Sequence, residues 1–487
     1  MNMKAYPSVK PFVPEYTLVV PKSETLKFDS HFESGNLRKA VKVSENEYNL
    51  LLDYDIETEG HTQWFYFSVK NYKQNHTVRF NIINLMKYES LYNNGMRPLA
   101  YSMATQEWQR AGFSISYYQN KTPRNIPQTA TRVPRFYYTL TYSYTFDTES
   151  DTVFFAHCYP FTYSELRKQL DQYIMQYPAL IRVNNLCSTL AGNPCPIVTI
   201  TQNVALCEPW EQEREKLEKT AAGRRILRMR EFKQRSLERA RSLKPGKRCT
   251  KKCVVMTARV HPGESNSSFM MKGAIDFLLS DKREAKVLRK NFVFKIVPML
   301  NPDGVRYGNY RCSLLGVDLN RRWKHPSPQL HPTVYYTKKL IQASSEDNEI
   351  TLFCDMHGHS MKKNVFMYAC SYPDRSLDSI RSNLYIKLMP YLMQSNSKFF
   401  SYKDSHFRVD KFKESTARVV VFREFDILAS YTLEASFYGP SSGNKDAHMD
   451  TNDLESVGRD LLKQLLVYIN PAMFTSCLLY TSDAADE

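Results

Sequence analysis

Two titratable side chains lie three residues apart at the end of an apolar run, in "CVVMTARVHPGES" (residues 253–265). The run predicts a buried strand that ends at His261, and the Pro-Gly pair that follows favours a tight turn before Glu264. Ser265 or Asn266 is then placed to cap a helix. Across such a turn, His261 and Glu264 can converge on one cation.

A third ligand for the same cation is predicted at the end of another apolar strand. "ITLFCDMHGHS" (residues 350–360) places His357 directly after a buried run, with His359 as the alternative. Catalytic zinc sites commonly take three His and carboxylate ligands and leave a fourth position for water. A histidine at a strand end is often only a hydrogen-bonded structural residue. Two such strand ends, one of them with HxxE spacing, favour a metal site.

A glutamate inside an apolar strand supplies the base that this chemistry needs. "ASYTLEASFYG" (residues 429–439) places Glu434 where an unpaired carboxylate is costly. Water activated by zinc still requires a carboxylate that carries its proton to the leaving group. We therefore interpret Glu434 as the base, with an internal salt bridge as the alternative.

Arginines gather in the loop that follows the apolar run "NFVFKIVPML". The stretch "NPDGVRYGNYRCSLLGVDLNRRW" (residues 301–323) contains Arg311 and the adjacent Asn320 and Arg321. Bidentate guanidinium contacts are well suited to the terminal carboxylate of a peptide. Loop arginines are usually only solvated, but their grouping after a strand end indicates a substrate site.

The elements that must position these residues form a predicted α/β layer. After residue 158, short strands that are apolar on both faces alternate with helical segments, as in "CPIVTITQ", "CVVMTARV" and "NVFMYAC". This pattern predicts a mixed or parallel sheet with helices on both faces, in a domain of residues 158–475. Ligands of such sheets bind at the carboxyl ends of the strands, where the candidate residues lie. The domain closes with a helix capped by Thr451 or Asn452, whose apolar stripe consists of Leu454, Val457, Leu461, Leu465 and Tyr468.

Residues 1–157 follow a different pattern. "HTQWFYFSVKN", "TVRFNIINL" and "RFYYTLTYSYTF" are rich in β-formers, and no convincing helix separates them. In the second of these stretches, Val78, Phe80 and Ile82 alternate with polar residues. We predict an antiparallel β-sandwich domain.

Composition narrows the class of protein. The 487 residues are 42% hydrophobic and 13% aromatic, which is typical of a well-buried globular chain. No apolar run suits a signal peptide or a membrane span, so we expect a cytoplasmic protein without a membrane partner. The ten cysteines lie mostly in apolar segments and are expected to be reduced core residues. Cys249 and Cys253 have no second pair with which to form a structural zinc site.

The positive charge is concentrated in one segment. The net charge is +16, and residues 211–252 hold 16 Lys and Arg against 6 Glu. This segment is expected to be a basic helical insertion, either simply solvated or acting as a landing surface for an acidic polymer. No recognised nucleic-acid motif accompanies it, so no nucleic-acid partner is expected. The last residues, 476–487, follow no element pattern, and we interpret them as a non-native tail.

Taken in order, "HPGE", "NPDG", "YRCSLLGVDLNR", "DMHGHS" and "SYTLEASF" resemble the metallocarboxypeptidase family that includes pancreatic carboxypeptidase A. Within it they resemble the cytosolic carboxypeptidase branch, and several stretches lean toward its second and third types. "HTQWFYF" and "FFAHCYPFTYSEL" are similar to that branch's N-terminal β domain, so the resemblance runs from about residue 25 to 470. It implies one zinc ion per chain, with His261, Glu264 and His357 as its ligands.

The resemblance also implies roles for the other candidates. Glu434 matches the general acid/base, and Arg311 matches the arginine that polarises the scissile carbonyl. Asn320 and Arg321 match the pair that grips the terminal carboxylate of the substrate. Arg418, in "STARVVVF", matches a basic residue at the base of the specificity pocket. An arginine in a dry pocket favours an acidic side chain and rejects apolar ones, which would leave its charge unpaired.

The sequence departs from the family's pattern at three points, one of which is a basic segment, 211–252, that looks longer than the corresponding connection in relatives. Ser415 and Ala417 stand where glycine is usual, which predicts a differently shaped loop beside Arg418. The tyrosine that closes over substrate in the pancreatic enzymes has no clear counterpart.

The implied function is removal of C-terminal or side-chain-linked glutamates from polyglutamylated tubulin or other acidic protein tails. Microtubules, centrioles, basal bodies and cilia are the locations that the resemblance implies within the cytoplasm. One alternative is an amidohydrolase acting on a small acylated amino acid, and another is a non-catalytic binder of acidic filaments. The β domain favours a macromolecular substrate over the first alternative, and the filled catalytic positions favour an enzyme over the second.

Overall fold

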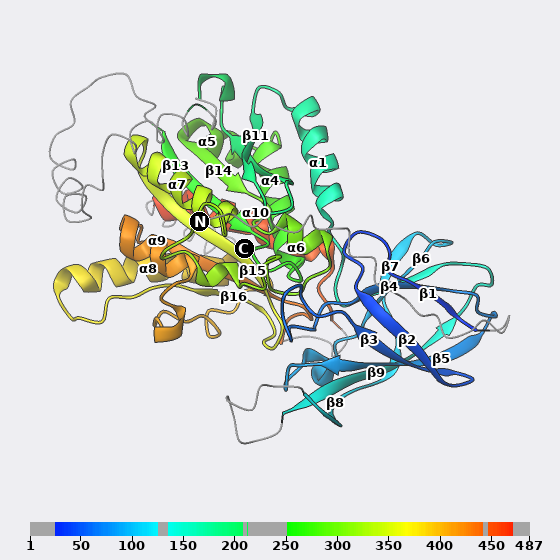
Figure 1. Cartoon of the computed structure of the whole chain (residues 1–487). Coiled ribbons are helices and arrows are strands. Elements are labelled where there is room, and N and C mark those ends of the chain that lie inside the picture. The colour runs from blue at the N-terminus through cyan, green and yellow to red at the C-terminus, as the bar shows by residue number, and fades with distance from the viewer. Residues whose placement is uncertain (1–24, 125–134, 208–211, 213–250, 442–446, 471–487) are drawn as a thin grey trace, which may run out of the picture.

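The computed structural model describes residues 25–124, 135–207, 212, 251–441 and 447–470 (Figure 1). The tail 476–487 and most of the basic segment 211–252 lie outside these ranges, so the expectations about them stay predictions.

The N-terminal part contains two five-stranded sheets (Figure 1). Buried aromatic side chains form much of their core. In hydrogen-bonded order, the first sheet consists of β1 (Lys27–Asp29), β4 (Tyr66–Lys70), β10 (Val153–Ala156), β6 (Leu99–Ser102) and β7 (Glu107–Arg110). The second consists of β2 (Leu37–Ser44), β3 (Glu47–Leu52), β5 (His76–Leu85), β9 (Phe136–Phe146) and β8 (Phe113–Pro123). Val78, Phe80 and Ile82 of β5 are fully buried, as their alternation predicts.

These sheets are antiparallel, as expected, except for one pair. Strands β3 and β5 run parallel, with Glu47 opposite Arg79 and Leu50 opposite Ile82. The cause lies in the connection, because the chain passes through β4 in the other sheet before it returns. Parallel neighbours need such a crossover, and a pattern of β-formers does not reveal it.

The C-terminal part is built on a seven-stranded mixed sheet. Its strands, in order, are β11 (Ile181–Ser188), β12 (Pro194–Ile200), β14 (Phe292–Val297), β13 (Lys252–Ala258), β15 (Ile350–His359), β17 (Ser430–Ser436) and β16 (Val365–Tyr368). The central strands β14, β13, β15 and β17 are parallel, and the outer ones are antiparallel to their neighbours. Sequence inspection missed β11, because this edge strand is only partly buried and has no apolar run.

Helices cover both faces of this sheet, as predicted (Figure 1). One face is covered by α1 (Tyr163–Gln176), α4 (Asn266–Leu279), α5 (Arg283–Asn291), α8 (Leu377–Asn396) and α10 (Thr451–Ile469). Helix α7 (Pro332–Asp347) packs on the other face, and α9 (Ala417–Phe425) contributes to the cores on both.

The cap of α10 differs from the prediction by one residue. Asp450, rather than Thr451 or Asn452, accepts a hydrogen bond from the backbone N–H of Asp453, and Asp453 completes a reciprocal capping box. Aspartate is as good a cap as threonine or asparagine, so the run of polar residues did not fix the start of the helix. The predicted apolar stripe is buried along its whole length.

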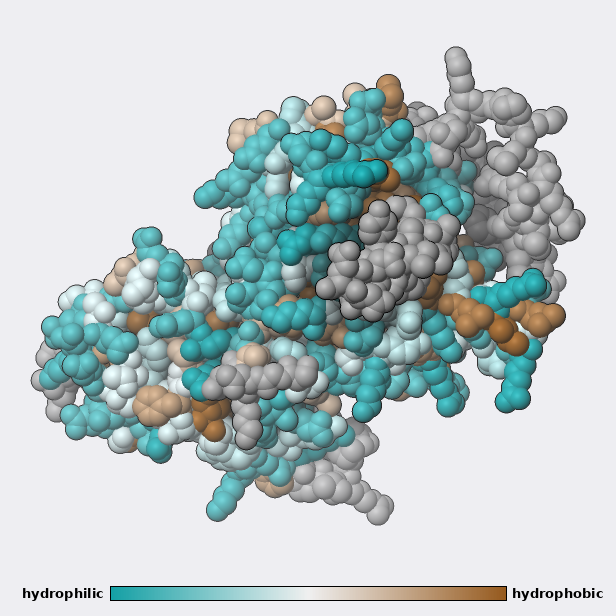
Figure 2. Space-filling model, turned by 180° about the vertical axis from the view of Figure 1, so that it is seen from behind, coloured by the Kyte–Doolittle hydropathy of each residue, from teal (hydrophilic) through white to brown (hydrophobic). Residues whose placement is uncertain are grey.

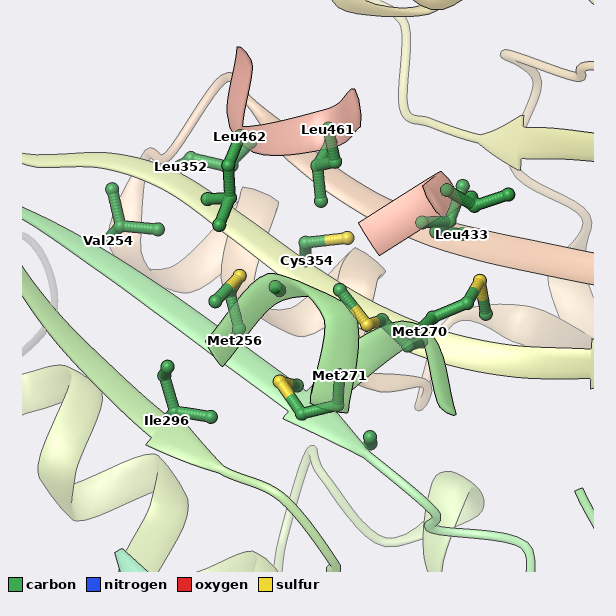
Figure 3. Packing of buried hydrophobic residues seen from close by; sticks show 14 of the residues in the cluster. Val254, Met256, Met270, Met271, Ile296, Leu352, Cys354, Leu433, Leu461 and Leu462 are labelled. Carbon is green, nitrogen blue, oxygen red and sulfur yellow. The ribbon is translucent and has the colours of Figure 1, made fainter. Parts of the chain in front are cut away.

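Helices α4 and α10 form the centre of the larger core. Figure 3 shows Met270 and Met271 of α4 among side chains of the sheet, with Leu461 of α10 nearby. The two helices touch through glycine, because a Cβ atom on Gly458 would lie 1.8 Å from the carbonyl oxygen of Met270. This close packing fixes the helix that begins directly after the predicted metal-binding turn.

The aromatic core of the sandwich includes side chains from the C-terminal part. Tyr310, Phe437 and Tyr438 come from the C-terminal part but belong to the aromatic core of the sandwich. Arg110 of β7 also donates a hydrogen bond to the carbonyl oxygen of Phe437 at 2.9 Å. The sandwich is therefore packed against the segments on either side of the candidate site.

Away from this contact, α8 leaves apolar side chains exposed. Leu377, Ile380 and Leu384 are 74, 45 and 66% exposed, and Figure 2 shows brown side chains projecting at the end of the molecule that carries α8. None of the described helices has both the length and the apolar character of a membrane span. The described cysteines are mostly buried, as expected of core residues.

Candidate active site

The turn after β13 is braced by a buried arginine. Arg259, 1% exposed and with a φ of 57°, donates hydrogen bonds from its guanidinium to the carbonyl oxygen of Pro262 and to Oγ of Ser268. The backbone N–H of Glu264 closes the turn on the carbonyl oxygen of His261 at 3.1 Å. β13 itself ends at Ala258, three residues before the predicted strand end.

The structure brings the three predicted ligands together. Nδ1 of His261 lies 2.7 Å from Oε1 of Glu264, and Nδ1 of His357 lies 2.9 Å from Oε2. All three residues are at most 6% exposed, and one ligand atom from each lies within 4.8 Å of the others. The three ligands lie together because β13 and β15 pair in parallel, which places the carboxyl ends of both strands at the same edge of the sheet.

Carboxylates hold the outer nitrogens of both imidazoles. Nε2 of His261 lies 3.1 Å from Oδ1 of Asp318, and Nε2 of His357 lies 2.8 Å from Oδ2 of Asp355. Such partners fix the ring orientation and tautomer of metal-binding histidines. With two Nδ1 atoms and one carboxylate facing inward, the donor set fits a catalytic zinc ion.

The electrostatics of this centre favour positive charge. Burial alone would lower the pKa of His357, but Asp355 and Glu264 raise it well above its usual range. Burial alone would raise the pKa of Glu264, but His261 and His357 hold it well below its usual range. The centre therefore accommodates a cation, whether a proton on an imidazole or a metal ion.

Glu434 lies beside this triad on the neighbouring strand. The register of β15 with β17 pairs His357 with Glu434. Burial raises the pKa of Glu434 to about 7, and the Glu264 carboxylate adds to the shift, while the histidines oppose it. Among the described residues no cation lies within ion-pair distance of Glu434, so the structure does not support the internal salt bridge.

Arg311 is held against the outer side of the triad. Its Nε and Nη2 donate to Oδ2 of Asp318 at 3.0 and 2.7 Å. The same Asp318 contacts His261, so one carboxylate orients both the ligand and the arginine. Its neighbours His261, Arg311 and Arg321 hold the pKa of Asp318 far below its usual range, although burial opposes this.

Asn320 and Arg321 follow in η3 (Leu319–Arg321) and line the same cavity. Oδ1 of Asn320 accepts a hydrogen bond of 2.9 Å from the backbone N–H of Ala417, at the start of α9. The loop before α9 is tied to this region too, since the N–H of Trp323 donates to the carbonyl oxygen of Ser415. Ser415 and Ala417, in the place of the expected glycines, therefore tie this loop to residues 320–323 through their backbones, although neither lines the cavity.

Arg418 is the second residue of α9 and lies on the cavity wall with 5% exposure. Its Nη1 donates to the carbonyl oxygen of Ala369 and to Sγ of Cys370. The guanidinium lies 6.0 Å from the ring centroid of Tyr368, which also lines the cavity. No carboxylate among the described residues is paired with Arg418.

All the candidate residues share one cavity of about 620 Å³. Sequence inspection missed several of its basic lining residues, namely Lys87, Lys362, Arg408 and Lys413. Lys87 comes from the sandwich, just after β5, and donates hydrogen bonds to the hydroxyls of Tyr310 and Ser360. The excess of cationic side chains suits an anionic ligand.

Three other functional positions were missed or left open. Asp318 lies inside a quoted motif, two residues before Asn320, and Asp355 lies two residues before His357 on the same strand, so local spacing could have found both. His359, the alternative ligand, lies outside the triad, and its Nδ1 accepts from the backbone N–H of Lys362 at 2.9 Å. Burial lowers the pKa of His359 to about 4.

Comparison with known proteins identifies two regions. Residues 166–440 match the family described as zinc carboxypeptidase, and residues 28–158 match the cytosolic carboxypeptidase N-terminal domain. The first match alone covers more than half of the chain.

Curated relatives are similar along most of the chain. Cytosolic carboxypeptidase 2 of Xenopus tropicalis is 41% identical over 465 residues, which are 93% of this chain and 43% of that protein. Human cytosolic carboxypeptidase 2 is 40% identical over 474 residues, 95% of this chain and 47% of the relative. Cytosolic carboxypeptidase 3 of Mus musculus is 41% identical over 468 residues, 93% of this chain and 41% of the relative. The chain thus spans less than half the length of these relatives.

Solved structures share the fold over both parts. A metallo-carboxypeptidase from Burkholderia cenocepacia aligns with a TM-score of 0.69 at 20% identity, covering 92% of this chain and all of the other. A metallo-carboxypeptidase from Pseudomonas aeruginosa aligns with a TM-score of 0.66 at 18% identity, covering 91 and 99%. Both alignments cover more than nine-tenths of this chain and therefore extend over both of its parts.

Proposed function

The chain belongs to the zinc carboxypeptidase family, and from this premise we propose that it removes C-terminal or side-chain-linked glutamates from polyglutamylated acidic proteins such as tubulin. The relatives named cytosolic carboxypeptidases support the reaction class, and the basic cavity supports an acidic substrate.

We infer the substrate preference from Arg418. This arginine is buried in the wall of the cavity that holds the His261, Glu264 and His357 triad, and no described carboxylate neutralises it. A buried charge without a partner is costly, so an acidic side chain of a substrate would complete the site. A leucine side chain in the same place would leave the guanidinium unpaired.

The donor set formed by His261, Glu264 and His357 would hold the zinc ion. When bound, zinc supplies Lewis-acid polarisation and lowers the pKa of water. Asp318 and Asp355 keep the imidazoles oriented for this task.

The protein's own residues supply the remaining steps. Glu434 takes the proton of the attacking water at its carboxylate and returns it to the departing nitrogen. Arg311 keeps Nε and Nη2 on Asp318 and offers Nη1, which has no acceptor among the described residues, to the carbonyl oxygen that becomes negative. Asn320 and Arg321 hold the terminal carboxylate and thereby orient the scissile bond.

The test is release of free glutamate from a polyglutamylated tubulin-tail peptide, with and without a zinc chelator, beside a matched peptide ending in leucine. We expect release of glutamate that the chelator abolishes, and little release of leucine. No release from either peptide, by protein shown to contain zinc, would overturn the proposal in favour of a small-molecule amidohydrolase or a non-catalytic binder.

A substitution at Arg418 separates the specificity from the chemistry. Arg418→Gln is expected to lower kcat/KM for terminal glutamate by about a hundredfold, because a charge-assisted contact contributes about 2–3 kcal/mol. Release of leucine should not fall. Arg423→Gln is the matched control, since Arg423 lies on the same helix but is half exposed and paired with Glu414.

A further inference from the structure

One buried carboxylate of the sandwich binds three consecutive backbone N–H groups of the loop that carries Arg311. Oδ1 of Asp55 accepts from Tyr310 at 2.5 Å, and Oδ2 accepts from Arg311 and Cys312, each at 2.7 Å. Asp55 is only 3% exposed. Successive N–H groups that converge in this way form an anion-binding concavity, here filled by a side chain from the other part of the molecule.

Neighbouring contacts hold the same loop against the sandwich. The backbone N–H of Ile56 donates to Oδ1 of Asn309 at 3.2 Å, just before the three N–H groups. Beyond them, Gly316 has a φ of 66° and lies so close to Glu57 that a Cβ atom would be 2.3 Å from its carbonyl oxygen. The loop is therefore seated on residues 55–57 along its length.

The two ends of Arg311 are held by different carboxylates. Asp318, from the C-terminal part, binds the guanidinium, while Asp55, from the sandwich, binds the backbone. A guanidinium on a long, flexible side chain is aimed accurately only if its backbone is also fixed.

We propose that Asp55 is a positioning residue for the reaction, which holds the backbone of residues 310–312 so that Arg311 points at the scissile carbonyl. This inference rests on the proposed carboxypeptidase function. It gives the sandwich a part in catalysis although Asp55 itself does not line the cavity.

Asparagine at position 55 tests this with almost no change in shape. A carboxylate accepts through both oxygens, but an amide offers one oxygen and one NH₂ group. In Asp55→Asn, whichever way the amide is turned, NH₂ faces at least one backbone N–H, which loses its buried acceptor. We expect the loop to shift and the full-length enzyme to lose about a hundredfold in kcat. KM should change little, because Asn320, Arg321 and Arg418 keep their own supports.

A double-mutant cycle distinguishes positioning from a general loss of folded protein. In the Arg311→Ala background, Asp55→Asn should cost less than about twofold in kcat, because the residue that it positions is gone. An equal loss in both backgrounds, or no loss in the single variant, would overturn the proposal. If Asp55→Asn does not fold, Asp55→Glu replaces it in the cycle, since it keeps the charge but lengthens the side chain by one methylene.

Asp53→Asn is the matched control, because Asp53 lies two residues away and has no contact with residues 310–312 among its described interactions. Hydrogen–deuterium exchange provides a readout that does not depend on activity. Peptides covering residues 310–312 should lose protection in Asp55→Asn and keep it in Asp53→Asn, and unchanged protection would overturn the anchoring. If the wild type cleaves no peptide but protection is lost, the proposed function has failed while the anchor stands.

Discussion

At the scale of single residues, Glu434 offers the most direct test of the chemistry. Glu434→Gln keeps the shape of the side chain but cannot accept a proton, so turnover should fall by about a thousandfold or more. Substrate binding should persist, because the residues proposed to hold the substrate are untouched. Initial rates and calorimetric binding of the glutamate peptide measure the two effects.

The control for this variant is Glu424→Gln, because Glu424 pairs with Lys338 at 2.7 Å and does not line the cavity. Wild-type turnover in Glu434→Gln would exclude Glu434 as the base.

The charges of the triad predict that zinc binding releases protons. In the metal-free protein Asp355 and Glu264 raise the pKa of His357 against the effect of burial, which favours a protonated imidazole, and burial raises the pKa of Glu434 to about 7. Zinc displaces the first proton and disfavours the second, so its affinity should increase as the pH rises from 6 to 8. Calorimetry in two buffers of different ionisation enthalpy should report at least about one proton released per zinc ion at pH 7.

Asp355→Asn should lower the pKa of His357 and reduce this release, whereas Asp374→Asn, on the surface before α8, should not. A zinc affinity that does not change between pH 6 and 8 would contradict the assignment of these charges.

A site residue could be predicted from the sequence where its own segment contains the signal, such as a spacing or a charge within an apolar run. His261 and Glu264 share a turn, and His357 and Glu434 interrupt apolar strands, so each stands out in its own segment. The contacts of Lys87 and Asp55 join residues more than 200 positions apart. The spacing of residues within one segment cannot predict such a contact, because the contact depends on how the sandwich packs against the α/β part.

At the scale of elements, strands with a clear apolar pattern were predicted, whereas an edge strand and a pairing between distant strands were not. Strands buried on both faces, such as β13 and β14, consist mainly of apolar residues and were found. The edge strand β11 contains several polar residues that are only partly buried, so it has no apolar run and was missed. The parallel pairing of β3 with β5 depends on a crossover through another sheet, which hydrophobic patterning does not encode.

The contact between α4 and α10 makes a prediction about stability. Gly458→Ala places a methyl group against the backbone of α4 at Met270, and overpacking of this kind costs about 1–3 kcal/mol. The cost should exceed the gain of up to about 1 kcal/mol in helix propensity. Denaturant unfolding should show a lower midpoint for this variant.

Asn452→Ala, at an exposed position of the same helix, is the control and should change the free energy of unfolding by less than about 0.5 kcal/mol. A Gly458→Ala protein as stable as the wild type would mean that the two helices can separate without cost.

At the scale of the whole molecule, the α/β part contributes side chains to the core of the sandwich. Tyr310 and Phe437 are buried among sandwich residues, and the cavity is lined by Tyr310 itself, by the adjacent Arg311 and by Glu434, three residues before Phe437. The segments that contain the catalytic residues thus pack against the sandwich and also line the cavity. Loss of structure in the sandwich would remove the packing under Arg311 and beside the strand of Glu434.

This packing between the two parts predicts that zinc stabilises a region that does not bind it. A ligand that binds only the folded state stabilises every segment that unfolds together with its site, by about 2.7 kcal/mol at a hundredfold excess over Kd. Hydrogen–deuterium exchange in increasing urea, with zinc and with chelator, measures the effect separately for β9 in the sandwich and β13 beneath the triad. Because Tyr310 and Phe437 are packed into the core of the sandwich, chelation should lower both unfolding midpoints equally. If only β13 responds, the sandwich unfolds as an independent unit and its contacts with Tyr310 and Phe437 are too weak to couple the two parts.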